Sequence, residues 1–186
     1  MKITIIAGSN RKDATSTRAA EYAAGRLTRQ GHTVQLFDLY KQPLPMYSPD
    51  AGADDSAVKL QRAMQEADAV ILTTPEYHGS ISGALKNALD YLGQSHFSGK
   101  AVLSISSAGG PIGVSSLQQL QAIVRNLHGI NSPEWISIGG AQRSLFEQKP
   151  ADYEHNSGIT DRIHRALDVF SELASRLTVP HPARTS

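Results

Sequence analysis

Residues 73–92, TTPEYHGSISGALKNALDYL, contain the change of backbone structure on which the interpretation of the whole chain depends. The stretch begins as the end of an apolar run, DAVILTT, which predicts a buried strand over 68–74. Pro75 has no amide hydrogen, so it disfavours extension of the strand's hydrogen-bond ladder and directs the chain outward. A polar and aromatic turn follows, and GALKNALDYL predicts a helix over 83–92. The stretch therefore predicts a strand, a turn and a helix in succession.

The same alternation of strand and helix continues in both directions along the chain. Apolar or alternating runs predict further strands at KITIIA (2–7), TVQLFDL (33–39), KAVLSIS (100–106) and PEWISIG (133–139). Apolar residues at helical spacing predict helices around 20–27, 60–67, 117–127 and 163–177. Five strands alternating with five helices predict an α/β protein, in which helices cover both faces of a parallel sheet. We expect residues 1–186 to form a single domain.

Composition and charge exclude several classes of protein. The 18 basic and 17 acidic side chains nearly cancel, so the electrostatic signature of nucleic-acid or anionic-membrane binding is absent. No apolar run approaches the roughly 18 residues that a membrane span needs, and the start MKITIIAGSN is too short in apolar residues for a signal peptide. We therefore expect a cytoplasmic protein. The absence of cysteine excludes disulfides and cysteine nucleophiles, and the seven scattered histidines predict no metal site.

The loop after the first strand, GSNRKDATST (8–17), is suited to an anion. In parallel sheets of this kind, ligands bind beyond the carboxyl ends of the strands. Arg11 supplies a guanidinium, and a helix N-terminus supplies free amide donors to a phosphate. Hydroxyl groups surround that helix start, at Ser9, Thr15, Ser16 and Thr17. The alternative is that Thr15, Ser16 or Thr17 is merely the helix N-cap and that Arg11 is solvated.

The turn after Pro75 is suited to a flat ring. Gly79 and Gly83 allow the backbone to approach a ligand or to turn tightly. Backbone amides could bind the carbonyl edge of an isoalloxazine or similar ring, while Tyr77 or His78 contacts its face. The alternatives are that Glu76 caps the following helix and that Tyr77 fills the core.

The third loop, SSAGGPIG (106–113), brings three glycines to the end of the fourth predicted strand. A turn so rich in glycine allows the backbone to pass close to a planar ligand. The alternative is an ordinary connection between a strand and a helix. All three loops are predicted at one rim of the sheet, which favours a ligand site there.

Together the three loops resemble those of the NADPH-dependent FMN reductase family of flavodoxin-like oxidoreductases. That family carries a Gly-Ser-x-Arg loop after its first strand, matched here by residues 8–11. It also carries Pro-Glu-Tyr-(Asn/His) followed by a Gly-x-Leu-Lys-Asn-Ala helix, matched by residues 75–92. A third signature corresponds to Ser107, Ala108, Gly109 and Gly113. The resemblance runs from residue 1 to about residue 140, and it is greatest to the bacterial FMN-dependent azoreductase and quinone reductase branch.

The resemblance implies a fold and a set of binding residues. The fold would be a flavodoxin-like three-layer sandwich with a five-stranded parallel sheet in the order 2-1-3-4-5. The FMN phosphate would be held by Ser9, Arg11, Ser16 and Thr17. The ring would be lined by Pro75, Glu76, Tyr77, His78 and Gly79, and its other edge closed by Ser107 and Gly109. His78 stands where many members have Asn, a departure that would affect substrate preference.

The same resemblance implies an activity. The chain would be an FMN-dependent NAD(P)H oxidoreductase, with NADPH as co-substrate, that passes a hydride through bound FMN in a ping-pong cycle. The acceptors would be small aromatic molecules such as azo compounds and quinones, with free FMN and chromate as further candidates. No catalytic side chain is required, although Tyr77 or His78 could relay a proton.

The residues also bear on other functions of the same fold class. A non-enzymatic flavodoxin-type electron carrier remains the alternative, although such proteins usually have a strongly acidic surface and this chain has a formal net charge of +1. A low-molecular-weight tyrosine phosphatase would need a cysteine. A response-regulator-like switch would need an aspartate at the end of the third strand, where this chain has Thr74 and Pro75.

The resemblance also implies a homodimer or homotetramer with the cleft near a subunit boundary. Four apolar residues on the helix from Gly83 fit either an interface or the core: Leu85, Leu89, Tyr91 and Leu92. The polar connection over 139–158 could cover a neighbouring subunit's cleft, or merely link the last strand to the last helix.

Overall fold

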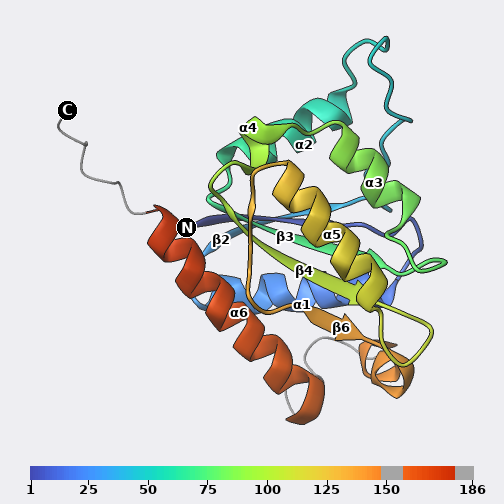
Figure 1. Cartoon of the computed structure of the whole chain (residues 1–186), viewed down its shortest axis with the longest axis vertical. Coiled ribbons are helices and arrows are strands. Elements are labelled where there is room, and N and C mark those ends of the chain that lie inside the picture. The colour runs from blue at the N-terminus through green and yellow to red at the C-terminus, as the bar shows by residue number, and fades with distance from the viewer. Residues whose placement is uncertain (148–156, 179–186) are drawn as a thin grey trace.

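The structure is a computed structural model that describes residues 1–147 and 157–178. Four longer strands make up most of one sheet: β1 (Lys2–Ala7), β2 (Thr33–Asp38), β3 (Ala69–Pro75) and β4 (Ala101–Ser107). Two short strands, β5 (Ile130–Asn131) and β6 (Ile136–Ile138), lie along the outer edge of β4. Every pairing is parallel, and the order is β2-β1-β3-β4-β5. The predicted flavodoxin-like topology is confirmed (Figure 1).

The predicted fifth strand, 133–139, is wrong in its extent. The edge consists of two pieces, with β5 beside Ala101 and Val102 and β6 beside Ile105 to Ser107. Pro133 lies between them and has no amide hydrogen to donate to a ladder. Among the residues that the structure describes, the sheet therefore has six strands, where the sequence predicts five.

Helices cover both faces of the sheet, as predicted. On one face, α1 (Thr15–Arg29) and α6 (Ser157–Thr178) pack with Ile3, Ile71 and Leu103 into one apolar core. The other face is covered by α2 (Asp55–Glu66), α3 (Gly83–Asp90), α4 (Gln94–Phe97) and α5 (Val114–Asn126). Successive residues of a strand point to opposite faces, so Ile5 and Ile6 belong to different cores. Two short helices were not predicted, α4 and the 3-10 helix η1 (Gly140–Glu147).

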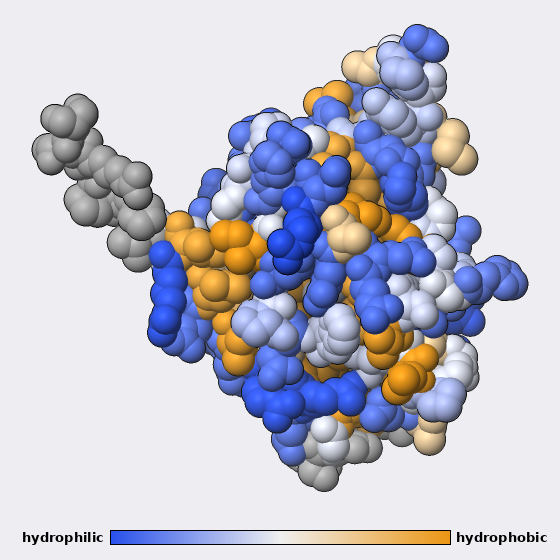
Figure 2. All heavy atoms as spheres, viewed as in Figure 1, coloured by the Kyte–Doolittle hydropathy of each residue, from blue (hydrophilic) through white to orange (hydrophobic). Residues whose placement is uncertain are grey.

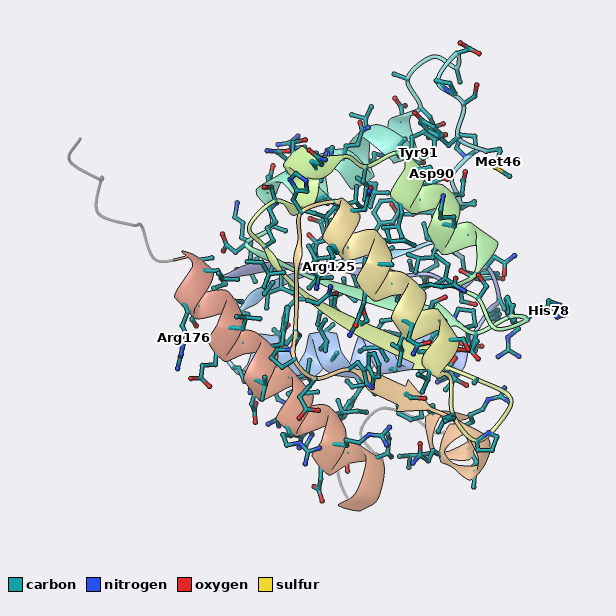
Figure 3. The ribbon with its side chains drawn as sticks, viewed as in Figure 1. Met46, His78, Asp90, Tyr91, Arg125 and Arg176 are labelled. Carbon is teal, nitrogen blue, oxygen red and sulfur yellow. The ribbon has the colours of Figure 1, made fainter. Side chains whose placement is uncertain are left out.

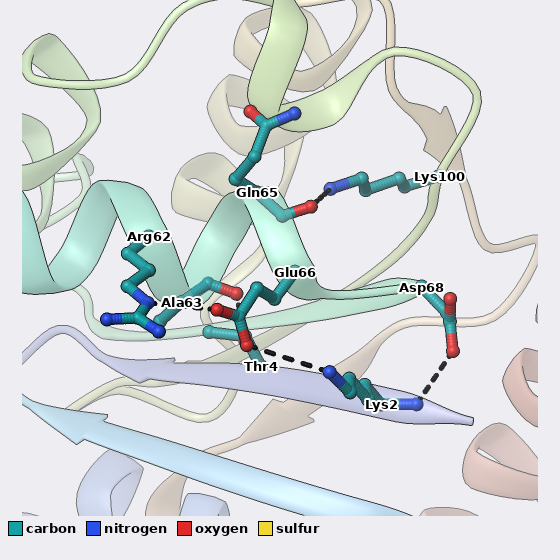
Figure 4. Close-up of polar contacts among 8 residues, drawn as sticks. All are labelled: Lys2, Thr4, Arg62, Ala63, Gln65, Glu66, Asp68 and Lys100. Carbon is teal, nitrogen blue, oxygen red and sulfur yellow. Dashed lines mark hydrogen bonds and ion pairs between the residues drawn. The ribbon is translucent and has the colours of Figure 1, made fainter.

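Polar contacts fix the end of α2 near the amino ends of the strands. This is the end of the sheet opposite the three loops (Figure 4). The Thr4 hydroxyl donates to the carbonyl of Ala63 at 2.9 Å. Lys100 donates to the last carbonyls of α2, those of Met64 at 2.5 Å and Gln65 at 3.4 Å, a favourable place for a cation. Burial lowers the pKa of Lys100 from its ordinary value. These contacts stabilise the end of the sheet away from the three loops, where no binding residue is predicted.

The face of the molecule drawn in Figure 2 is mainly polar. Hydrophilic side chains cover most of the face seen in Figure 2, and apolar side chains show mainly between them. Within the two described ranges, no helix has both the length and the apolar character that crossing a bilayer requires.

Candidate functional site

The first loop places two unpaired hydroxyls at the start of α1. The N-cap is Ala14, whose side chain makes no capping bond, so the interpretation of Thr15, Ser16 or Thr17 as the N-cap is wrong. Ser16 and Thr17 are buried, and their hydroxyl oxygens have no hydrogen-bond partner among the described residues. A buried hydroxyl without a partner costs about 1–3 kcal/mol. These two donors, beside the free amides of a helix N-terminus, fit a phosphate.

Ser9 and Arg11 lie in the same loop but are oriented differently. The Ser9 side chain is fully buried, and its hydroxyl accepts a hydrogen bond from the Arg11 amide at 3.1 Å. The Arg11 guanidinium makes no ion pair or hydrogen bond with any described residue, and Arg11 is exposed. The Arg11 guanidinium is therefore available to an anion. Ser9 instead stabilises the shape of the loop through its hydrogen bond with the Arg11 amide.

The second loop is a tight hairpin that projects beyond the end of β3. Tyr77 and Ser80 exchange two backbone hydrogen bonds of 3.0 Å. Between them, His78 and Gly79 have φ angles of +52° and +70°, the combination of a type I′ turn. Tyr77 is 44% exposed, so the prediction that it fills the core is wrong. Figure 3 shows His78 at the tip of this turn, pointing away from the body of the protein.

Glu76 caps a helix, but not the one that follows it in the chain. Its Oε2 accepts hydrogen bonds from the amide and the hydroxyl of Ser116, both at 2.9 Å. Ser116 lies in the first turn of α5, where a carboxylate is stabilised by the helix dipole. The following helix, α3, is capped by Ser82, which accepts from the amide of Leu85 at 3.0 Å. Glu76 thus joins the second loop to the helix after the third.

The third loop is fixed by a close approach at Gly113. A Cβ atom there would lie 2.6 Å from the Ser106 hydroxyl and 3.0 Å from the Ala108 Cβ. The Gly113 amide donates to the Ser137 hydroxyl at 2.8 Å. The loop is therefore more constrained than an ordinary connection, because both its glycine and its link to β6 are required for the packing.

The first and second loops are bonded to each other. The Ser82 hydroxyl donates to the carbonyl of Gly8, and the Ser82 amide donates to the Thr74 hydroxyl at 3.0 Å. A Cβ at Gly8 would lie 2.5 Å from the Thr73 carbonyl oxygen, so only glycine allows this approach. The carboxyl ends of β1, β3 and β4 consequently form one rim, on the right in Figure 1.

A cavity of about 400 Å³ opens where the three loops meet. This volume lies within the range of small-molecule sites, roughly 300–1,000 Å³. The cavity brings together six of the predicted residues: Arg11, Pro75, Glu76, Tyr77, Ser107 and Gly109. It does not include Ser9, Ser16, Thr17, His78 or Gly79, although Thr17 and Arg11 line a smaller neighbouring cavity of about 90 Å³. The described parts of the chain contain no group of three or more residues suited to hold a metal ion.

Three residues that line the main cavity were not among the predicted binding residues: Ala14, Ala108, which the sequence offered only as part of the third signature, and Arg143. Arg143 comes from η1, within the polar connection whose role the sequence left open. Its segment has no motif, and only the proximity of η1 to the third loop brings the guanidinium to the cavity. The remainder of that connection, 148–156, lies outside the described residues.

The helix from Gly83 offers no apolar interface in this structure. Leu85, Leu89 and Leu92 are buried in the core of the same chain. Tyr91 instead packs edge-on against Tyr47, with the two ring centroids 5.1 Å apart. The Tyr91 hydroxyl donates to the carbonyl of Pro45 at 3.1 Å. The four residues therefore serve the internal packing of the subunit.

Comparison with known proteins identifies relatives over most of the chain. A family model described as NADPH-dependent FMN reductase matches residues 1–143. An NADPH azoreductase of Bacillus sp. (strain OY1-2) is 34% identical over 143 residues, which are 75% of this chain and 78% of that protein. An FMN-dependent NADPH-azoreductase of Staphylococcus saprophyticus is 35% identical over 143 residues, covering 74% and 76%. The apo form of the NADH:FMN oxidoreductase EMOB shares the fold, with a TM-score of 0.72, 22% identity and coverage of 96% and 91%.

Proposed function

The chain belongs to the NADPH-dependent FMN reductase family and is an FMN-dependent NAD(P)H oxidoreductase, and from this premise we propose that it reduces azo compounds and other small aromatic acceptors. The observation that carries the proposal is the cavity of about 400 Å³ at the rim where the three loops meet. The names of the relatives favour azo compounds as the acceptors. Quinones belong to the proposal because an open cavity that accepts one planar molecule discriminates weakly against others.

The residues around the cavity fit FMN, because buried donors lie beside an opening large enough for a ring. In the proposal, the phosphate binds Arg11, the hydroxyls of Ser16 and Thr17, and the start of α1, with Ser9 holding the loop in shape. The ring is lined by Pro75, Glu76, Tyr77, Ser107 and Gly109. His78 and Gly79 contribute through the backbone of their turn. When bound, FMN supplies the hydride chemistry between NADPH and the acceptor.

The side chains of this protein bind, orient and supply protons. An azo bond takes up four electrons and four protons to give two amines, so each molecule consumes two NADPH and two further protons. Tyr77 is the better candidate for relaying a proton, because it lines the cavity whereas His78 points away from the protein. The hydrogen bonds from Ser116 hold the Glu76 carboxylate at the cavity wall.

The function is tested by an anaerobic titration of the FMN-loaded protein. NADPH should bleach the visible flavin band, and an azo dye should restore it with two NADPH consumed per dye molecule. A bound flavin that NADPH does not bleach would instead indicate an electron carrier that another protein reduces. Failure to retain FMN would contradict the assignment of all three loops.

The proposed assembly is a homodimer or homotetramer. Exposed apolar side chains on the loop before α2 support it, with Met46 82% exposed beside Tyr47. A monomeric mass in light scattering, with and without FMN, would contradict this proposal. A cytoplasmic location stays a prediction, which cell fractionation would test.

A further inference from the structure

Arg143 is held in place by the backbone of its own segment. The Gly140 amide donates to the carbonyl of Gly110 at 2.8 Å. A Cβ at Gly139 would collide with the carbonyl of Pro111, so η1 lies directly against the third loop. Phe146, at the other end of η1, is fully buried in the core. The position of Arg143 is therefore fixed from both ends of the short helix.

The Arg143 side chain reaches the cavity without a partner of its own. It is half-buried, and its Nη1 lies 3.8 Å from the point that a Cβ of Gly109 would occupy. It makes no ion pair or hydrogen bond with another residue of 1–147 or 157–178. By contrast, Arg176 pairs with Glu172 on α6, and Lys86 pairs with Asp90 on α3. Arg143 therefore presents an uncompensated cation to the cavity wall.

The charges around the cavity do not balance. Arg11 and Arg143 are both lining residues and neither is paired within the described chain. The acidic residue of the lining is Glu76, whose carboxylate is already bonded to Ser116 at the positive end of α5. An excess of positive charge in a cavity raises the local concentration of anionic ligands. The cavity is thus suited to a molecule with at least one negative group beyond the FMN phosphate.

We propose that Arg143 is a specificity-determining residue that favours aromatic acceptors carrying a sulfonate or carboxylate group. The inference rests on the proposed function, because Arg11 is there assigned to the FMN phosphate and Arg143 is the cation left for the acceptor. A guanidinium binds a planar or tetrahedral oxyanion through two parallel hydrogen bonds, which a lysine cannot reproduce.

The test compares three azo dyes of one skeleton: 4-aminoazobenzene, its 4′-sulfonate and its 4′-trimethylammonium derivative. The variants are Arg143→Gln and Arg143→Lys, and the control is Arg125→Gln. Arg125 is exposed in the last turn of α5, at the end opposite the Ser116 turn, and its loss changes the net charge equally (Figure 3). In Arg143→Gln, the kcat/KM ratio of sulfonate to neutral dye should fall about tenfold, as expected for loss of a charge-assisted pair. Arg143→Lys should fall in between, and Arg125→Gln should match the unaltered protein.

Three measurements separate binding of the acceptor from other effects. Calorimetry should show that naphthalene-2-sulfonate binds the oxidised FMN-loaded protein about tenfold more weakly in Arg143→Gln and unchanged in Arg125→Gln. The reduction potential of the bound FMN should be the same in all variants. A lowered potential in Arg143→Gln would show that Arg143 acts on the flavin, and would overturn the proposal. A raised KM for NADPH but not for NADH would show that it binds the phosphate of NADPH, which would overturn it equally.

The outcomes also separate this inference from the proposed function. If the unaltered protein reduces the neutral and sulfonated dyes with equal kcat/KM, the specificity inference fails while azo reduction stands. If it reduces none of the three dyes, the proposed function itself fails.

Discussion

Ser16 and Thr17 are buried at the start of α1, and no described residue accepts or donates a hydrogen bond at their hydroxyl oxygens. In the protein without FMN these groups destabilise the fold, and in the complex they would stabilise the bound phosphate. Removal of either hydroxyl should therefore stabilise the FMN-free protein and destabilise the complex with FMN.

We predict that Ser16→Ala weakens FMN binding about tenfold, as loss of a hydrogen bond to a charged group implies. The FMN-free protein should keep or slightly raise its midpoint of unfolding, because a buried unpaired hydroxyl is lost. Fluorescence titration with FMN and thermal melts of the same samples measure both. Thr28→Ala, in the last turn of the same helix, is the control, since the Thr28 hydroxyl donates only to Ala24. Equal FMN affinity in Ser16→Ala and the control would contradict the phosphate assignment.

His78 occupies a backbone conformation that suits asparagine better. Its φ of +52° is in the left-handed region, which asparagine tolerates, and it precedes Gly79 in a type I′ turn. We predict that His78→Asn raises the free energy of unfolding by about 0.5 kcal/mol. Urea titration of the FMN-free protein measures the free energy of unfolding. His128→Asn provides a comparison, because His128 is a second histidine at positive φ and lies outside the site. Because His78 points away from the cavity, the rate of flavin reduction by NADPH should be unchanged, and a large fall would assign His78 a direct role.

At the scale of one element, α4 depends on a histidine for its start. The Gly93 amide donates to the His96 Nδ1 at 3.0 Å, and the His96 amide donates to the Gly93 carbonyl at the same distance. Burial is the largest cause and lowers the pKa of His96 below its ordinary value of 6.5, and it outweighs the opposing effect of the hydrogen bond with the Gly93 backbone. The folded protein therefore binds this proton less readily than the unfolded chain does.

This difference predicts how the stability depends on pH. Above pH 6.5 both states are neutral at His96, and its contribution to stability is fully present. As the pH falls below 6.5 and then through the lowered folded pKa, the unfolded state takes up more protons and stability is lost. His96→Asn keeps an acceptor for Gly93 but does not titrate, so it should lose less stability between pH 7 and pH 5. Burial also lowers the pKa of His32, so the difference between the two pH curves, measured by urea unfolding, isolates His96. Parallel curves would contradict the prediction.

At the scale of the whole molecule, α6 completes a core that the matched family region does not complete alone. The family model ends at residue 143, yet Ile163, Leu167 and Phe170 are buried on the face where α6 packs against β4, β6 and α1. Residues beyond the shared region are therefore required to close one face of the sheet.

We predict that Phe170→Ala lowers the free energy of unfolding by about 3–5 kcal/mol, because a fully buried ring leaves a cavity in a close-packed core. The exposed Arg176, which pairs with Glu172 on the same helix, provides the control (Figure 3). Arg176→Ala should cost less than about 1 kcal/mol, since exposed ion pairs contribute little. Chemical denaturation of the two variants measures the difference. A loss below about 1 kcal/mol in Phe170→Ala would show that α6 is dispensable to the core.

The sequence predicted most of the fold because its longer strands are continuous apolar or alternating runs. KITIIA and KAVLSIS became β1 and β4 within a residue of the predicted bounds. The extent of the fifth strand was wrong, and β5 was missed, because two and three residues are too few to show a period. The helix α4 was missed because a single turn of helix shows none.

The candidate site was predicted where local motifs define it and missed where tertiary packing does. Arg11, Glu76 and Tyr77 follow strands directly, so the topology alone brings them to one rim. The partner of Glu76 could not be predicted, because Ser116 is 40 residues away and meets it only through the register of β3 and β4. Arg143 was missed for the same reason, since it depends on how Gly139 and Gly140 pack against the third loop.

The divided edge of the sheet affects the tendency of the protein to aggregate at high concentration. A continuous free strand presents a row of unpaired amides and carbonyls on which another chain can pair, which is a common start of amyloid growth. Here the edge beside β4 is broken into β5 and β6 with Pro133 between them. Neither piece is long enough to template a foreign strand, so this side of the sheet is protected against fibril formation by its own interruption.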